Sequence, residues 1–186
     1  MIVIGLLSGP ESAGVVEIAR RAAAAGSKVE LIGLVPGDPS WDTTLFEVAQ
    51  AGVGHATVVR SARSSMEAAD LDLALRYLPD IRCVVLAAAP AQLLETAVAG
   101  ADYAGAPLVI VGPLDPETMA ALEARGAGDA DTAGRAPAPV ILEPPAQDPD
   151  ETFAGFVAAL AVRLDQGEPA ESALRSTLVA LAVDPV

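Results

Sequence analysis

IVIGLLSGPESAGVVEIARRAAAAGSKVELIGLV, residues 2–35, contains two apolar blocks separated by a segment of different periodicity. The blocks Ile2–Leu7 and Lys28–Val35 are apolar over most of their length, which is typical of strands in a parallel sheet that helices cover on both faces. Between them, apolar residues of Ser12–Ala25 recur at helical spacing. Gly26 is placed to end this helix, because glycine adopts the left-handed conformation that helix termini favour. The stretch therefore predicts a strand, a helix and a second strand.

The same alternation continues to the end of the chain. It predicts a three-layer α/β sandwich with a mostly parallel central sheet, formed by residues 1–186 as one domain. Within it, the Gly-, Pro- and Ala-rich residues 125–138 are predicted to form a flexible, exposed loop without regular structure. The further strands are predicted at Ala56–Val59, Arg82–Ala88, Leu108–Gly112 and Pro139–Leu142. The further helices are predicted at Asp42–Ala51, Asp70–Leu78, Ala91–Tyr103, Pro116–Ala124, Pro149–Leu164 and Pro169–Val183.

The composition excludes several classes of function. The chain has 186 residues, of which 11 are Lys or Arg and 25 are Asp or Glu, so its net charge is −14. Such an acidic chain repels phosphate backbones and anionic lipid surfaces, and we expect neither nucleic-acid nor membrane binding. His55 and Cys83 are the only histidine and the only cysteine, which leaves little for a metal centre or an internal disulfide. Without a signal peptide or a long apolar run, the expected location is the cytoplasm.

Three segments carry a resemblance to a known family. Residues 11–53 place Gly26, Gly33 and Asp38 in the register of a "V-x-x-x-G-x-V-G-x-D" strand, and residues 69–88, ADLDLALRYLPDIRCVVLAA, resemble a later strand. Residues 151–183 begin ETFAGFVAALAV and are similar to a "D-T-F-x-G" helix pair. Together these segments resemble the ribokinase-like sugar and nucleoside kinases, the PfkB family, in a truncated and degenerate form. The resemblance implies the ribokinase-like fold and, in intact members, transfer of phosphate from ATP with magnesium.

The positions that carry the family's chemistry have changed. By the resemblance, Glu17 stands where the family has a sugar-binding asparagine, Glu151 at the catalytic-base aspartate, and Asp148-Pro149-Asp150 at the Gly-Ala-Gly anion hole. An anion hole works because bare N–H groups at a helix N-terminus face the phosphate. Two carboxylates would repel that phosphate, and a proline removes one N–H group. Residues 61–69 are also too few to build the β-lid that covers the family's sugar.

Two motifs have a structural as well as a functional interpretation. Asp148 at the N-cap, Pro149 at N1 and Glu151 at N3 match a capping box that opens an amphipathic helix, which we favour over a working base at Glu151. The tetrapeptide Gly126–Asp129 matches the family's anion-hole sequence, but no predicted strand leads into it and no apolar helix follows. We therefore interpret it as a loop sequence rather than a site.

These observations favour a non-catalytic binding or interaction module, with a small-ligand sensor as a variant. A ligand crevice would lie at the carboxyl ends of the strands, near Gly14, Glu17 and Asp38. We expect no cofactor and no metal. A homodimer is expected, because loss of the lid exposes apolar sheet edge or surface. We also expect the module to bind an unknown protein partner or a small molecule. The alternative is a minimal active sugar or nucleoside kinase that uses ATP with magnesium and Glu151 as its base.

Overall fold

Strands and helices alternate along the whole described part of the chain. The computed structural model describes residues 1–6, 12–63, 65–87, 91–126, 136–146 and 151–183. The strands are β1 (Ile2–Leu6), β2 (Val29–Val35), β3 (Gly54–Arg60), β4 (Cys83–Ala87), β5 (Leu108–Val111) and β6 (Val140–Leu142). The helices are α1 (Ser12–Ala24), α2 (Ser40–Gln50), α3 (Ala68–Tyr77), the 3-10 turn η1 (Ala91–Leu93), α4 (Leu94–Ala104), α5 (Pro116–Gly126), α6 (Thr152–Asp165) and α7 (Ala170–Val183).

The six strands form one sheet in the order β3-β2-β1-β4-β5-β6, and every neighbouring pair is parallel. The predicted, mostly parallel sheet is therefore confirmed. Strands β1, β2 and β3 follow one another toward one edge of the sheet. The chain then returns to the centre, where β4 pairs with β1, and β5 and β6 extend the sheet to the other edge. Between β1 and β4 the strand order reverses, and at such a point the connections leave a crevice at the carboxyl ends of the strands.

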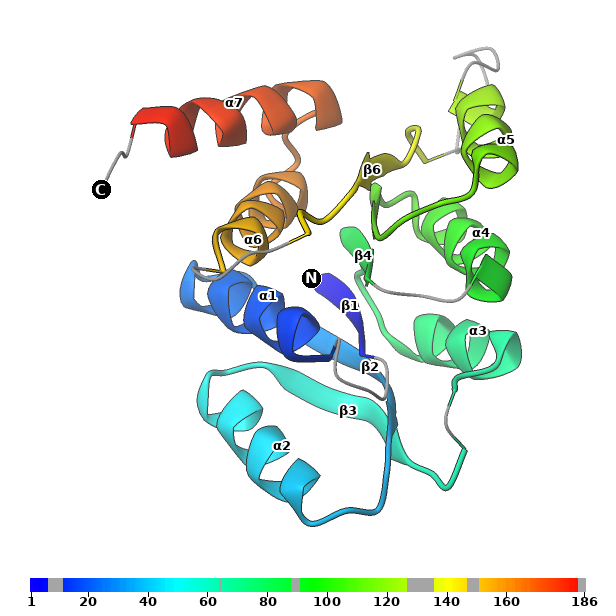
Figure 1. Ribbon diagram of the computed structural model, residues 1–186, viewed down its shortest axis with the longest axis vertical. Coiled ribbons are helices and arrows are strands. Elements are labelled where there is room, and N and C mark those ends of the chain that lie inside the picture. Colours follow the sequence, from blue (N-terminus) through cyan, green and yellow to red (C-terminus); the bar gives the residue numbers. More distant parts are fainter. Residues whose placement is uncertain (7–11, 64, 88–90, 127–135, 147–150, 184–186) are drawn as a thin grey trace.

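Helices cover both faces of the sheet and make it a three-layer sandwich (Figure 1). On one face α1 and α6 bury Val15, Ile18 and Leu160 against the strands. On the other face α3 and α4 bury Leu71 and Leu94. Every residue of β2 and β4 is buried, as the continuous apolar blocks predict. No helix in the described residues has the length and apolar character needed to cross a bilayer.

Several element boundaries differ by one to three residues from the sequence prediction, and one of them changes the predicted loop. Helix α5 runs to Gly126, so Arg125 and Gly126 are helical rather than the beginning of the predicted loop. The helix extends to these residues because glutamate, alanine and arginine are good helix formers. Residues 127–135 of the predicted loop lie outside the described residues, and residues 136–138 form no helix or strand.

Candidate functional site

A crevice of about 320 Å³ lies at the carboxyl ends of the strands on the α1 and α6 side of the sheet. This volume is at the lower end of the range for small-molecule sites. Its described lining consists of apolar residues and glycines, without a charged, hydroxyl or amide side chain. The lining residues are Gly14, Val15 and Ile18 of α1, Ala87, Val111, Gly112, Pro113, Pro144 and Pro145 at the strand ends, and Phe153 and Ala154 of α6.

Local sequence shapes the walls of the crevice. Gly112 follows β5 with φ 150°, a backbone angle that favours glycine, and its N–H group donates a 3.0 Å hydrogen bond to the carbonyl of Leu142. This bond holds the ends of β5 and β6 together. Phe153 is held by Phe156 of the same helix, whose ring stacks on it with centroids 6.5 Å apart. At Gly14 an added Cβ atom would meet nothing within 4 Å, so this wall is open to the crevice.

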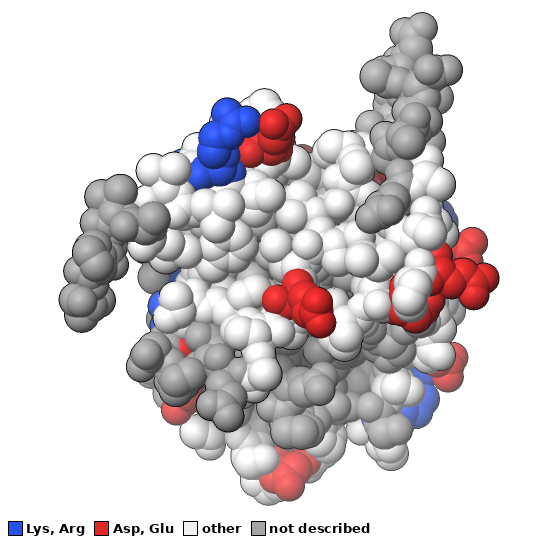
Figure 2. Space-filling model, turned by 45° about the horizontal axis from the view of Figure 1, so that its top comes forward, with Lys and Arg blue, Asp and Glu red and all other residues white. Residues whose placement is uncertain are grey.

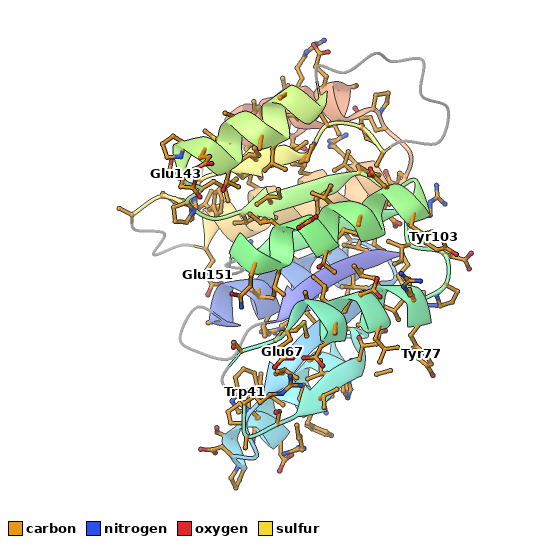
Figure 3. The ribbon with its side chains drawn as sticks, turned by 90° about the vertical axis from the view of Figure 1, so that its right-hand side faces the viewer. Trp41, Glu67, Tyr77, Tyr103, Glu143 and Glu151 are labelled. Carbon is orange, nitrogen blue, oxygen red and sulfur yellow. The ribbon has the colours of Figure 1, made fainter. Side chains whose placement is uncertain are left out.

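Carboxylates lie at this end of the molecule. Figure 3 shows Glu143 and Glu151 at the same end of the strands, opposite Tyr77 and Tyr103. Glu143 is exposed and immediately precedes the lining residue Pro144. The side chain of Glu151 is 60% exposed and comes two residues before Phe153. These acidic groups disfavour an anionic ligand in the crevice.

The predicted capping box at the start of α6 is wrong. Helix α6 begins at Thr152, and Glu151 is its N-cap rather than its N3 residue. Glu151 has φ 52° and ψ 29°, and its side chain makes no capping hydrogen bond. The left-handed backbone at Glu151 interrupts the helical geometry that a start at Pro149 requires. Asp148, Pro149 and Asp150, the predicted vestigial anion hole, lie outside the described residues.

The three residues predicted to mark the ligand crevice are not brought together. Gly14 lies in the lining. The Glu17 carboxylate is not among the lining residues and accepts a 2.6 Å hydrogen bond from Nε of Arg21 on its own helix. Asp38 follows β2 and accepts a 2.8 Å hydrogen bond from the N–H group of Ser40 at the start of α2. That bond lowers the pKa of the Asp38 carboxyl. Asp38 therefore stabilises the turn that leads into α2.

The described lining does not fit a magnesium nucleotide. It contains no Lys or Arg to neutralise phosphate, and no carboxylate or hydroxyl oxygen to hold magnesium. Lys28, the only lysine, immediately precedes β2 and so lies at the opposite end of the strands. The structure describes no phosphate site at the tetrapeptide Gly126–Asp129 either. Gly126 is the last residue of α5, and the other three residues lie outside the described residues.

Cys83 and His55, whose side chains are of reactive types, also lie outside the crevice lining. Cys83 is fully buried in β4, and burial raises the pKa of its thiol to about 12, so it is a packing residue rather than a nucleophile. His55 lies in β3, and its Nδ1 atom is buried without a hydrogen-bond partner. Among the described residues, no three His, Cys, Asp or Glu side chains are grouped as metal ligands would be.

A larger hollow of about 600 Å³ lies at the amino ends of the strands, between α3 and α4. Its wall includes Asp72 and Arg76, which form a 2.9 Å ion pair, and Tyr103, which is 88% exposed. Tyr103 lies at the opposite end of the molecule from Glu151 (Figure 3). Because open parallel α/β sheets bind ligands at the carboxyl ends of their strands, the smaller crevice is the better candidate.

Sequence reasoning missed most of the crevice wall. Gly112-Pro113 and Pro144-Pro145 were not singled out, although each pair closely follows a strand. Their position directly after predicted parallel strands is a signal that could have found them, because the carboxyl ends of these strands meet at one edge of the sheet. No comparable signal marks Phe153 as a lining residue, because its spacing in the sequence also fits a core position of α6.

Comparison with known proteins shows the fold. No protein-family model and no curated protein matches the sequence. Among solved structures, a protein described as Sa239 is 12% identical with a TM-score of 0.64, over 100% of this chain and 94% of the other. A PfkB protein from Polaromonas sp. JS666 is 15% identical with a TM-score of 0.56, over 94% of this chain and 89% of the other. The chain therefore has the three-layer α/β fold of ribokinase-like proteins, as the sequence resemblance implied.

Proposed function

We propose that this chain is a non-catalytic binding module with a ribokinase-like fold. Its crevice takes a small molecule with an apolar body that is uncharged or cationic, and the chain acts as a sensor or an interaction module for that molecule. The observation that carries the proposal is the apolar lining of the crevice together with the carboxylates of Glu143 and Glu151 at the same end of the sheet.

Charge argues against phosphate as the ligand. A phosphoryl group needs several donors or cations at the position where its charge develops. The described crevice wall supplies none of these from side chains, and Arg21 of α1 already pairs with Glu17 and Glu151. A bound triphosphate would therefore replace its hydration with apolar contacts and nearby carboxylates, which is unfavourable.

The test is saturation-transfer NMR with indole and adenosine as uncharged probes and ATP with magnesium as the anionic probe. We expect transfer to at least one uncharged probe and none to ATP. Gly14→Phe should abolish that transfer, because the added ring fills the open space beside Gly14. Ala13→Phe is the matched control, since Ala13 is exposed on the same helix and is not a lining residue. Equal transfer in both variants, or transfer to ATP alone, would refute the proposal.

A minimal kinase is the second candidate, and one observation favours it. Glu151 has the left-handed backbone φ of 52° beside the crevice, and strained backbone of this kind gathers at functional sites. The test is ATP turnover with a panel of sugars and nucleosides, comparing the wild type with Glu151→Ala. We expect no turnover in either protein. Turnover in the wild type that Glu151→Ala removes would establish a kinase with Glu151 as its base.

A further inference from the structure

One turn of α7, residues 178–181, is apolar and exposed on all sides. The part of α7 before this turn packs against α6, and its residues Ala173 and Thr177 are fully buried. The next four residues, Leu178–Leu181, are all exposed and all apolar. The large side chains among them are exposed by 55% at Leu178, 57% at Val179 and 42% at Leu181. Figure 1 shows this end of α7 extending past the rest of the molecule.

Four consecutive residues span one full turn of an α-helix, so this segment has no polar face. A helix that is apolar all round is normally buried. The exposed Leu73 and Tyr77 of α3 differ in this respect, because Leu71, Ala74 and Leu75 bury the other face of their helix. Residues 178–181 therefore require an additional covering surface, which the exposed residues of α3 do not.

Charge indicates what can cover this segment. The chain carries a net charge of −14, so most contacts between two copies would bring carboxylates together. Helix α7 has no Asp or Glu after Glu171, and Arg175 is its only later charged residue. In Figure 2 the side of the molecule that carries α7 turns toward the viewer, and most of its described surface is uncharged. Two copies can meet here without the repulsion that other surfaces would produce.

We propose that a second copy of this chain covers residues 178–181, by antiparallel packing of the two α7 helices across a two-fold axis near Leu178 and Val179. Such an interface is self-complementary, because each copy offers the same surface. The antiparallel arrangement places Arg175 of each copy opposite the last turn of the other α7. Arg175 is 72% exposed and pairs within its helix with Glu171, at 3.0 Å. Its positive charge complements the negative end of the facing helix dipole.

This surface differs from the sheet edge that loss of a lid would expose. It also shares no residue with the crevice, so the inference does not depend on the proposed ligand binding. Few side chains take part, which puts the contact near or below the roughly 1,200 Å² at the small end of stable interfaces. We therefore expect a weak, concentration-dependent dimer.

Sedimentation velocity from about 1 to about 300 µM tests the proposal, a range that brackets micromolar affinity. The wild type should change from the 18.7 kDa monomer at low concentration to a dimer of twice that mass at high concentration. Leu178→Glu should stay monomeric. Leu73→Glu, at a leucine 69% exposed on α3, should dimerise like the wild type. Circular dichroism checks that both variants are folded. A wild type that remains monomeric throughout, or a Leu178→Glu protein that dimerises normally, would overturn the proposal.

Two further variants test the orientation of the helices. Val179→Cys, close to the two-fold axis, should give a covalent dimer with a short bis-maleimide crosslinker, whereas Leu73→Cys should not. The native Cys83 does not compete, because it is fully buried. Arg175→Glu should weaken association roughly three- to tenfold through the helix dipole. Arg76→Glu is its matched control, because Arg76 is 70% exposed and also pairs one turn away, with Asp72. Equal association of the two charge variants would refute the antiparallel arrangement.

Discussion

The Nη2 atom of Arg21 lies 3.5 Å from the Oε2 atom of Glu151 and joins the second half of α1 to the residue that precedes α6. Gly155 makes room for this contact, because an added Cβ there would lie 3.0 Å from Nη1 of Arg21. The same guanidinium donates a 2.6 Å hydrogen bond from Nε to the carboxylate of Glu17, its second partner. Both carboxylates that occupy family site positions by resemblance are therefore engaged by one arginine.

Replacement of Glu151 by Gln is expected to change the free energy of unfolding by less than about 1 kcal/mol, because exposed ion pairs contribute little. The Arg21 and Glu151 side chains are 41% and 60% exposed. Urea denaturation of Glu151→Gln, Arg21→Ala and the double variant measures the coupling between the two residues. A coupling of several kcal/mol would mean that this contact is a structural requirement of the α1–α6 packing.

Replacement of Asp165 is expected to lower the free energy of unfolding by more than replacement of Glu151. Its carboxylate accepts a 2.7 Å hydrogen bond from the Met1 ammonium group and a 3.1 Å hydrogen bond from the Ser27 hydroxyl. The two charged groups are 3% and 14% exposed. Asp165→Asn leaves the ammonium group buried without its counter-charge, and should cost about 3 kcal/mol of unfolding free energy. The control is Asp72→Asn, which removes a carboxylate from a largely exposed pair and should cost far less. Similar losses in the two variants would contradict this prediction.

A side chain at Gly54, at the start of β3, is expected to destabilise the protein by displacing Glu30. A Cβ atom at this position would overlap the carboxylate of Glu30. Glu30 is 8% exposed in β2, and its Oε1 atom accepts a 2.7 Å hydrogen bond from the N–H group of Ala56. Gly54→Ala should therefore lower the melting temperature, whereas Gly37→Ala, where an added Cβ would meet nothing within 4 Å, should not. In the Gly54→Ala/Glu30→Ala double variant the losses should be less than additive. Strict additivity would show that the two residues do not interact.

The turn between α6 and α7 should make stability depend on pH. Glu168 accepts hydrogen bonds from Ser172 at 2.6 Å and Ser176 at 2.9 Å, and these bonds lower its pKa below the ordinary value of 4.5. As the pH falls below 4.5, the unfolded state takes up the proton first, so this contribution is present at neutral pH and is lost in acid. The stability advantage of wild type over Glu168→Gln should therefore shrink below that pH in parallel urea titrations.

The matched control for this titration is the Ser172→Ala/Ser176→Ala double variant, which keeps the carboxylate and removes its two hydroxyl donors. It should show a smaller loss of stability between neutral and acidic pH than the wild type. An unchanged acid dependence in the double variant would assign the effect to groups other than Glu168.

The sequence by itself determined the elements and the layers. The apolar run Val29–Val35 becomes a fully buried strand, because a strand covered on both faces needs apolar side chains at successive positions. Gly14 could also be placed near the crevice, because it lies in the first turn of the helix that follows the first strand. Only the tertiary structure decided the strand order, the left-handed backbone at Glu151 and its contact with Arg21, 130 positions earlier. It also decided that α7 leaves residues 178–181 uncovered. Periodicity records which face of an element is apolar, whereas the neighbour that each face meets depends on how all the elements pack.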